Sequence, residues 1–432
     1  MLYYSTNHNS PLVNFREATI TGQPPDKGLY FPSSIPRLDD NFLKSFRNLT
    51  REELAFEIIK PYTGDTIPAD ELKRIITDTI SFDIPLVKVE NDIYSLELFH
   101  GPTLAFKDVG ARFMSRCLEY FVKDSIGKLV ILTATSGDTG GAVASGFYKT
   151  AGIDVVILYP SGKVSNIQEA QLTRHGNNIH ALEIDGSFDD CQRMVKQAFA
   201  DEQLNGNLKL TSANSINVAR WLPQQFYYFF ALQQWPFAEP PVISVPSGNF
   251  GNLCAGLLAY TSGLSAAHFI AACNQNDVVP LYFQTSRYEP KPSVSTLSNA
   301  MDVGDPSNFI RILELFQFDF NKLSNLITSY SISDEETRSV IREVYATLNY
   351  LPDPHGAVAF ASLKKYQKDH PGTKGIFLET AHPLKFNNVV EPLTGKEISM
   401  PASIAGLLKE EKVSVQMEAD YNELKNYLMR SF

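Results

Sequence analysis

From residue 128 onward, short apolar runs rich in β-branched residues alternate with segments of helical pattern. The runs lie at 128–134 (KLVILTA), 153–160 (IDVVILYP), 179–184 (IHALEI), 208–212 (LKLTS), 241–246 (PVISVP), 268–273 (HFIAAC) and 374–380 (KGIFLET). Each run has the length of a buried strand, and the stretches between the first six have the length of a turn plus a helix. Strands that alternate with helices form βαβ units, so the pattern predicts an α/β fold with mostly parallel sheets covered on both faces.

Several of the intervening segments predict particular helices. Ser165 followed by Gln168 forms a capping-box pattern for a helix over 165–176, and Ser187 is the predicted cap of a helix over 187–202. Residues 142–152 predict a helix that ends at a glycine. The aromatic-rich segment 215–235 predicts one long helix, and 320–350 is predicted to be mainly helical and to face the surface.

The chain is too long for one simple core. With 432 residues, two or three packed units are expected. Residues 1–95 differ from the rest because proline and asparagine interrupt short helical patterns, one of which begins with the capping-box pair Thr50 and Glu53. We therefore predict a small N-terminal domain over 1–95 and a catalytic region over 96–432.

Charge and residue spacing argue against several classes of function. A net charge of −10 argues against a nucleic-acid or anionic-membrane surface, although a local basic site for a small anion is compatible with it. The four cysteines are far apart, which argues against a zinc or disulfide framework and suits a cytoplasmic protein. No His-Glu-x-x-His pattern supports metal hydrolysis, and no secretory signal or membrane-spanning run occurs, so neither a metal nor a membrane partner is predicted.

Three polar loops directly follow predicted strands. They are TSGDTGG (135–141), SGNFGN (247–252) and TAHPLKF (380–386). In open α/β sheets, ligands bind outside the carboxyl ends of the strands. We therefore expect the three loops to face one crevice.

The loop at 246–252 (PSGNFGN) has the composition of a phosphate-binding loop. Gly248 and Gly251 allow the backbone to approach a ligand closely, and the helix that follows would present free N–H groups. The loop matches neither the Walker pattern nor Gly-x-Gly-x-x-Gly, which argues against a nucleotide. A tight strand-to-helix turn without a ligand is the alternative interpretation.

The loop at 135–139 places the hydroxyls of Thr135, Ser136 and Thr139 ahead of a predicted helix. Hydroxyls and free amides at a helix N-terminus suit a carboxylate or a phosphate, whereas a simple N-capping turn is the alternative. Asp138 would oppose an anion, so we expect it to orient the loop or to meet a donor.

More polar side chains follow the strand at 208–212, namely Asn214, Ser215, Asn217 and Arg220. The guanidinium of Arg220 matches the geometry of a phosphate, and Lys163 has a comparable position after its own strand. Each cation taken alone is more simply an ordinary solvated residue. Two cations on loops at the same sheet edge favour an anion site.

Lys107 lies among Phe106, Val109 and Phe113, just after a Gly-Pro-Thr turn. Taken alone, it is most simply an ordinary helix lysine that extends its ammonium into water. A buried lysine, however, loses its proton easily and becomes a nucleophile. Pyridoxal 5′-phosphate (PLP) requires a phosphate loop, a lysine for an imine bond and a partner for its pyridine nitrogen. A phosphate loop without a nucleotide motif, together with this lysine, therefore predicts PLP.

These segments together resemble the threonine synthase family, which belongs to the fold type II PLP enzymes related to the tryptophan synthase β chain. The similarity covers nearly the whole chain, in order, through segments at 3–36, 100–113 (HGPTLAFKDVGARF), 133–142 (TATSGDTGGA), 246–252 and 379–386 (ETAHPLKF). It implies two mostly parallel, three-layer α/β units around a cleft, plus a small N-terminal domain.

The resemblance also implies roles for individual residues. Lys107 would be the catalytic residue and would bind PLP through an imine, and Thr380 would face the pyridine nitrogen. The cofactor phosphate would be held by the backbone amides of Gly248, Asn249, Phe250, Gly251 and Asn252. The substrate carboxylate would be bound by Thr135, Ser136, Gly137, Asp138 and Thr139. The substrate phosphate would be bound by Lys163, Asn214, Ser215, Asn217 and Arg220.

The implied reaction converts O-phospho-L-homoserine and water to L-threonine and phosphate, the last step of threonine biosynthesis. One alternative is a related fold type II phospho-lyase that releases a 2-keto acid, ammonia and phosphate. Another is a catalytically silent PLP-binding protein. Early entry of water would divert the reaction, so we expect the α/β unit at about 128–235 to close on the rest. A monomer is expected, with a homodimer as the alternative.

Overall fold

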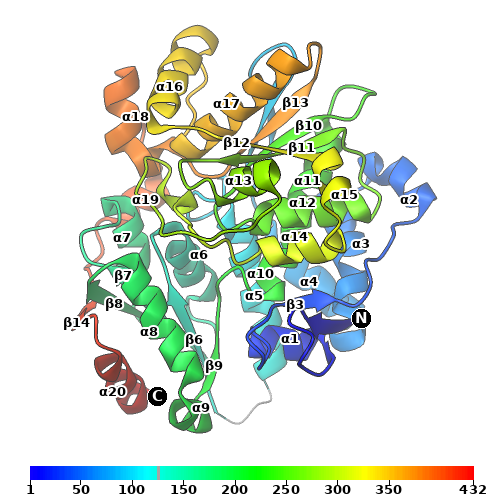
Figure 1. Cartoon of the computed structure of the whole chain (residues 1–432). Coiled ribbons are helices and arrows are strands. Elements are labelled where there is room, and N and C mark those ends of the chain that lie inside the picture. The colour runs from blue at the N-terminus through cyan, green and yellow to red at the C-terminus, as the bar shows by residue number, and fades with distance from the viewer. Residues whose placement is uncertain (124–126) are drawn as a thin grey trace.

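The computed structural model describes residues 1–123 and 127–432, and this part of the chain contains three sheets (Figure 1). The largest has six strands in the order β12 (Ile327–Ser331), β11 (His268–Cys273), β10 (Val242–Pro246), β13 (Gly375–Glu379), β5 (Ile93–Glu97) and β4 (Leu86–Lys88). Its strands are parallel except for the antiparallel pair of β4 and β5. Helix α17 (Pro354–Asp369) packs on β10 and β13 on one side of this sheet, while α11 (Gln225–Gln234) and α12 (Gly251–Thr261) lie on the other (Figure 1).

The second sheet has five parallel strands, in the order β14 (Val415–Glu418), β8 (Ile179–Asp185), β7 (Ile153–Pro160), β6 (Leu129–Ala134) and β9 (Lys209–Thr211). Every residue of β6 and of β7 is buried. Alternate residues of these strands face two different apolar clusters: Ile131 and Val155 face the main core, whereas Val130 and Val156 face a second core beneath α8 (Phe188–Ala200) and α20 (Tyr421–Ser431). Burial on both faces explains why the sequence shows continuous apolar runs rather than alternation.

The N-terminal part adds a three-stranded antiparallel sheet of β2 (Val13–Asn14), β1 (Leu2–Ser5) and β3 (Tyr30–Pro32). Its helices are α1 (Phe15–Thr21), α2 (Asp40–Ser45), α3 (Arg51–Thr63) and α4 (Ala69–Thr79). The capping box of Thr50 and Glu53 starts α3, as predicted. Strands β4 and β5, which follow α4, belong to the six-stranded sheet.

The predicted strands and most predicted helix starts are confirmed. Helix α7 (Asn166–Thr173) has the capping box of Ser165 and Gln168, and Ser187 caps α8. The remaining helices are α9 (Glu202–Asn207), α13 (Val278–Thr285), α14 (Phe309–Leu315), α18 (Asn387–Thr394) and α19 (Ala402–Leu407), with short 3-10 helices η1 (Phe46–Asn48), η2 (Gly64–Thr66), η4 (Asn299–Met301) and η5 (Pro383–Phe386).

Two predictions about helices are wrong, and a third is confirmed with one strand added. The single helix over 215–235 is α10 (Val218–Trp221), η3 (Leu222–Gln224) and α11, because Pro223 has no N–H to continue the helical bonding. Residues 320–350 are mainly helical, as predicted, in α15 (Phe320–Leu326) and α16 (Asp334–Leu348), but the edge strand β12 lies between them; its mixed polar sequence does not resemble a buried strand. Helix α6 (Asp138–Phe147) begins four residues before the predicted 142, so Asp138 lies in its first turn.

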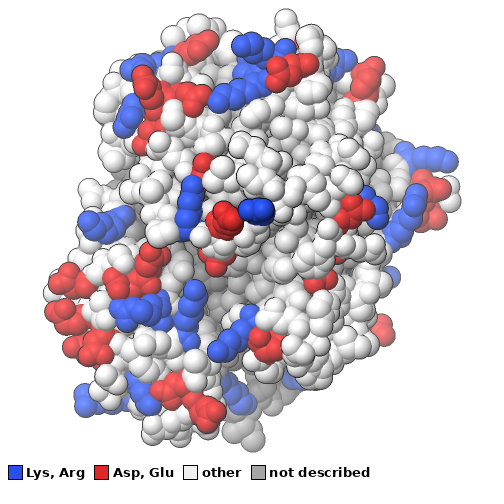
Figure 2. All heavy atoms as spheres, viewed as in Figure 1, with Lys and Arg blue, Asp and Glu red and all other residues white. Residues whose placement is uncertain are grey.

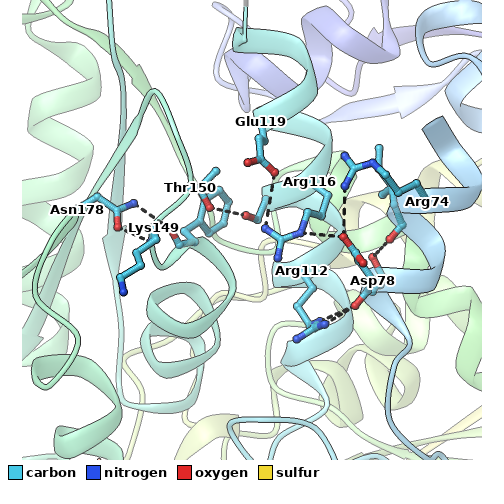
Figure 3. Close-up of polar contacts among 12 residues, drawn as sticks. Arg74, Asp78, Arg112, Arg116, Glu119, Lys149, Thr150 and Asn178 are labelled. Atoms are coloured by element: carbon cyan, nitrogen blue, oxygen red, sulfur yellow. Dashed lines mark hydrogen bonds and ion pairs between the residues drawn. The ribbon is translucent and has the colours of Figure 1, made fainter. Parts of the chain in front are cut away.

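Helix α5 (Lys107–Val122) lies between the N-terminal helices and the five-stranded unit (Figure 1). Arg112 donates to the carbonyl of Asp78 on α4, and Arg116 pairs with the Asp78 carboxylate at 3.4 Å (Figure 3). On the other side, Ser115 and Thr150 share a hydrogen bond of 3.1 Å. Polar contacts on two sides thus fix the helix whose first residue is Lys107.

The surface carries acidic and basic side chains of both signs, interspersed over the face seen in Figure 2. In residues 1–123 and 127–432, no helix is long and apolar enough to cross a membrane.

Close packing of α5 on α10 at Gly110 gives a first prediction. A Cβ at Gly110 would lie 2.5 Å from the carbonyl oxygen of Arg220, so Gly110→Ala must displace backbone. We expect the substitution to lower the free energy of unfolding by about 1–3 kcal/mol, measured by urea denaturation. Gly206→Ala is the matched control, because nothing lies within 4 Å of a Cβ there. Equal stability of the two variants would contradict this packing argument.

Candidate active site

The polar loops at the strand ends contact one another, as the parallel topology predicts. Asn214, after β9, donates to the carbonyl of Ala134 at the end of β6 with a distance of 3.3 Å. Asn249, after β10, donates to Ser215 Oγ at 2.8 Å. Lys385, after β13, pairs with Asp138 at 2.7 Å. The loops after four strands therefore form one continuous polar region at the carboxyl edges of both sheets.

Lys107 is the first residue of α5, and its side chain is partly buried beside that edge. Desolvation lowers the pKa of Lys107 from 10.5 to about 8; the charge of Asp138 opposes this shift, while those of Lys385 and Arg220 add to it. The amine therefore loses its proton far more easily than an ordinary lysine, as a nucleophile or a general base requires.

The turn before Lys107 is held by Asp108, to which the sequence assigned no role. Asp108 accepts hydrogen bonds from Thr103 N at 2.9 Å and from Thr103 Oγ1 at 2.6 Å. Leu104 adopts a left-handed conformation with φ of 57°. Phe106 N donates to the carbonyl of Thr380 at 2.9 Å, so the turn is also joined to the end of β13. These bonds fix the direction in which α5 begins.

The loop at 246–252 has the features expected of an anion cradle. The backbone amides of Gly248, Asn249, Phe250, Gly251 and Asn252 make no hydrogen bond within the described residues. Phe250 has a left-handed conformation with φ of 62°, and α12 begins at the next residue. Gly248 is packed so closely that a Cβ there would lie 2.5 Å from Met301 Cα. Consecutive unpaired amides at a helix N-terminus suit a phosphate group.

Side chains hold this loop in shape. Asn252 donates to the carbonyl of Pro246 at 2.7 Å, and Asn249 accepts a hydrogen bond from Ser307 N at 2.6 Å. Ser215 accepts hydrogen bonds from both Asn249 and Asn308, so it lies against the phosphate loop. The loop is therefore held open by its own side chains.

In the loop at 135–139, the hydroxyls of Ser136 and Thr139 differ from that of Thr135 in their hydrogen bonding. Thr135 Oγ1 accepts hydrogen bonds from Gly137 N and Gly140 N, at 3.0 and 2.8 Å, and so caps α6. Ser136 and Thr139 are partly buried, and their hydroxyls have no hydrogen-bond partner in the part of the chain that the structure describes. Gly137 has φ of 132°, a conformation that only glycine adopts readily.

Asp138 has donors on two sides. Gln168 donates to it at 2.9 Å, and the ammonium of Lys385 lies 2.7 Å away. Burial alone would raise the pKa of Asp138, but the charges of Lys385 and Lys107 and these hydrogen bonds hold it well below its ordinary value. Asp138 thus meets donors, which is one of the two roles expected for it from the sequence.

The predicted substrate-phosphate residues after β9 occupy different environments. Arg220 is buried, and its guanidinium donates to the carbonyl of Ala213 at 2.6 Å. Its Nε has no partner in the described chain. Burial lowers the pKa of Arg220 to about 10. Asn217 is also buried, but it caps α10 and donates to the carbonyls of Thr19 and Ser212. In this conformation its side chain is fully used by the protein itself.

Lys163 and Thr380 also differ in exposure. Lys163 lies exposed on the turn between β7 and α7. Thr380 is buried directly after β13, and its hydroxyl makes no hydrogen bond within residues 1–123 and 127–432. Its hydroxyl is not among the fully buried atoms of the described chain, so Thr380 offers a free hydroxyl to a molecule bound beside it.

Sequence reasoning missed Lys385, and it missed a second role of Gln168. Lys385 lies in the segment TAHPLKF (380–386), in which only Thr380 received a role from the resemblance. Gln168 was identified only as a capping-box residue, and it fulfils that role while its amide nitrogen reaches Asp138. No local pattern signals such a contact, because the partners are 30 residues apart for Gln168 and far more distant for Lys385.

Comparison with known proteins agrees with this geometry. Residues 80–378 match the family described as "Pyridoxal-phosphate dependent enzyme". Residues 2–80 match "Threonine synthase N terminus", and residues 356–428 match "Threonine synthase, C-terminal". The sheets and these matches together define a fold type II PLP-dependent enzyme, whose cofactor is pyridoxal phosphate.

Individual relatives are similar over their whole length. The chain is 44% identical to threonine synthase of Haemophilus influenzae, with 100% of both chains covered. Its structure resembles that of threonine synthase from Escherichia coli, with a TM-score of 0.93, 41% identity and 100% of both chains covered. PLP-bound threonine synthase from Brucella melitensis gives a TM-score of 0.93 at 32% identity, covering 100% of this chain and 99% of that one. The chain belongs to the threonine synthase family.

The residues present fit the cofactor. A phosphate requires donors, and the five consecutive amides at 248–252 donate to no group in residues 1–123 and 127–432. A covalent imine requires a neutral amine, and burial brings the pKa of Lys107 to about 8. Thr380 offers an unpaired hydroxyl near the end of β13. These are the three kinds of group that the cofactor requires.

The lowered pKa of Lys107 predicts its reactivity in PLP-free protein. Because only the neutral amine reacts, acylation of Lys107, followed by mass spectrometry, should be half-maximal near pH 8. In denaturant the midpoint should return to the ordinary lysine value of 10.5. The same midpoint in folded and unfolded protein would refute the burial argument.

The same shift has a consequence for stability. Between pH 8 and 10.5, Lys107 carries a proton in the unfolded chain but not in the folded one. The unfolded state thus binds more protons, so the free energy of unfolding of PLP-free protein should rise with pH through this window. In Lys107→Met, urea denaturation should show a smaller rise.

Proposed function

We propose that this protein is a threonine synthase that converts O-phospho-L-homoserine and water to L-threonine and phosphate. The observation that carries the proposal is the coexistence of a partly buried, easily deprotonated Lys107 with the unpaired amides of 248–252, in a chain that is similar to threonine synthases over its full length. A cytoplasmic enzyme is also proposed, supported by four free, buried cysteines. A monomer stays a prediction from the resemblance.

In the proposed site, Lys107 would hold the cofactor covalently, and the amides of Gly248, Asn249, Phe250, Gly251 and Asn252 would hold its phosphate. Thr380 would supply a hydroxyl for the pyridine nitrogen. When bound, PLP stores the electron pair that remains when a proton leaves a carbon next to the substrate amine. All other tasks fall to groups of the protein.

Lys107 is the proposed general base. When substrate displaces Lys107, Nζ could remove the proton from the substrate Cα, because a pKa of about 8 gives a far larger fraction of neutral amine near neutral pH than an ordinary lysine has. The same flexible side chain can serve Cβ, whose proton must leave before the γ-phosphate departs. It can return one proton to Cγ, which becomes the methyl group of threonine, and another to Cα after water adds at Cβ; the proton released by the water goes to the departing phosphate.

The substrate is held at its two anionic ends. The proposed carboxylate site is Thr135, Ser136, Gly137, Asp138 and Thr139. Ser136 and Thr139 supply unpaired hydroxyls, and Thr135 and Asp138 shape the loop. The proposed phosphate site is Lys163, Asn214, Ser215, Asn217 and Arg220. Within it, Arg220 has an unpaired Nε that can stabilise the phosphate as it leaves.

The exposed position of Lys163 and the need to exclude water support a closing motion. We propose that the part of the segment at about 128–235 that carries the five-stranded sheet moves toward the remainder of the catalytic region, 96–432, when substrate binds. Helix α11, which packs with α12 and α3, would stay with the six-stranded sheet, and the domain of residues 1–95 would be part of the fixed body. Strands β6, β7, β8 and β9 of the moving unit form one sheet, which the C-terminal strand β14 completes. The C-terminal strand and α20 would move with this unit.

Replacement of Lys107 tests the catalytic assignment. Lys107→Ala should reduce threonine formation by at least about 10³-fold, because covalent attachment and the base are both lost, while the fold survives. Borohydride reduction of the wild type, followed by peptide mapping, should place the pyridoxyl group on Lys107 alone. Lys364→Ala is the control, since Lys364 pairs with Glu90 at the surface.

Product analysis separates the proposed reaction from its alternatives. Threonine and phosphate in equal amounts support the proposal. A 2-keto acid with ammonia and phosphate would instead identify a phospho-lyase, and a yellow protein without turnover would identify a silent PLP-binding protein.

Small-angle scattering tests the closing motion. The radius of gyration of the PLP-bound enzyme should decrease when a phosphonate analogue of the substrate is added, because the unit at 128–235 then covers the site. Phosphate alone is the control ligand, since it cannot bridge the carboxylate and phosphate loops. An unchanged radius with saturating analogue would argue against closure.

A further inference from the structure

Lys385 is a fully buried cation that the proposed mechanism does not use. It lies in η5, directly after β13, and its exposed fraction is 0%. Its ammonium contacts Asp138 Oδ1 at 2.7 Å and donates to the carbonyl of Thr103 at 2.9 Å. Burying a charge in this way is costly unless it is paired, and replacing such a pair by apolar side chains often stabilises a protein. Stability alone is therefore a weak explanation of this pair.

Both partners of Lys385 belong to segments of the proposed active site. Asp138 is the first residue of α6, in the carboxylate loop. Thr103 lies in the turn that precedes Lys107 and is hydrogen-bonded through its N and Oγ1 to Asp108, in the first turn of α5. One ammonium thus joins the loop that would bind the substrate carboxylate to the segment that bears the reactive lysine.

Helix α7 completes the connection from the other side. Gln168 donates to Asp138 at 2.9 Å, and Gln171 donates to the carbonyl of Thr103 at 3.0 Å. Each acceptor therefore receives one hydrogen bond from Lys385 and one from a glutamine of α7. Lys385 carries the only full charge among these donors, so it contributes the strongest of these interactions.

Lys385 also belongs to the charged surroundings of Lys107. The charged groups that act on Lys107 are Asp138 of α6, Lys385 of η5 and Arg220 of α10, and the phenol of Tyr227 on α11 donates to the adjacent carbonyl of Phe106. Lys385 and Arg220 disfavour the protonated amine, and Asp138 favours it. Asp138 and Lys385 therefore act on Lys107 in opposite directions.

We propose that Lys385 is a positioning residue for the reaction: it fixes the carboxylate loop through Asp138 and the turn before Lys107 through Thr103, and it supplies a permanent positive charge near the reactive amine. The expected effect on kcat and KM rests on the proposed function. The electrostatic part, which is the effect of the Lys385 charge on the titration of the bound cofactor, requires only that PLP is bound.

The test compares PLP-loaded Lys385→Met, Lys385→Arg and wild-type enzyme. Lys385→Met removes the charge at similar length, and Lys385→Arg retains it. Lys364→Met, which breaks an exposed pair with Glu90, is the matched control. Three quantities are measured: the melting temperature, the kinetic constants kcat and KM, and the pH midpoint of the visible absorbance of the bound cofactor.

In Lys385→Met, the pH midpoint of the cofactor absorbance should rise by about 1 unit. The positive charge of Lys385 is then lost, so it no longer repels the protonated nitrogen of Lys107. The value of kcat/KM should fall roughly 10- to 100-fold, as expected when a charge-assisted hydrogen bond is lost. Lys385→Arg should recover most of the midpoint shift and part of the activity. A folded Lys385→Met with a wild-type midpoint and kinetic constants within twofold of the wild type would overturn the proposal.

Asp138→Asn keeps the proposal testable if Lys385→Met does not fold. Removal of the carboxylate leaves Lys385 unopposed, so the midpoint should move downward, opposite to Lys385→Met. An unchanged or raised midpoint in folded Asp138→Asn would overturn the electrostatic part. If the wild type binds PLP but forms no threonine, the proposed function fails, while the midpoints still decide the role of Lys385.

Discussion

The cost of holding an amine in a desolvated site governs the design of this protein. Lys107 starts a helix that is fixed by Arg112, Arg116 and Ser115, so the position of its backbone beside the polar loops is fixed. Burial then brings its pKa to about 8. The lowered pKa of Lys107 therefore depends on where α5 is packed. The contacts of Arg112, Arg116 and Ser115, which fix α5, are as relevant to the chemistry as the loops themselves.

The charges around the amine of Lys107 act on its pKa in opposite directions. A single acidic neighbour would restore the proton to Lys107, and a single basic one would leave the buried region with uncompensated positive charge. Asp138 and Lys385 are present as a pair, and Asp108 is satisfied by Thr103. Burial raises the pKa of Asp108, and the hydrogen bonds from Thr103 oppose that rise.

Much of this arrangement could be predicted from the sequence, because the relevant signals are local. Continuous apolar runs identify strands buried on both faces, and the capping pairs at Thr50, Ser165 and Ser187 identify helix starts. The break at Pro223 was visible but was outweighed by the aromatic run around it. Contacts between distant segments leave no such signal. Lys385 looks like any lysine in its own segment, and only the fold brings it to Asp138; likewise, Asn217 offers a neutral donor in sequence but is used by Thr19 of the N-terminal part.

The proposed assignment places two phosphates in one site, and the structure contains two different kinds of anion donor. The amides of 248–252 carry no net charge and belong to a rigid loop at a helix N-terminus, so they suit a phosphate that must stay. Arg220 is buried, its Nε has no partner in the described chain, and it lies on α10, which follows β9 in the segment proposed to move. A cation from a moving unit suits the phosphate that must leave, because its attraction is strongest for the charge that develops at departure and is released on opening. Separation of the two donor kinds lets one site retain its cofactor while it discharges its product.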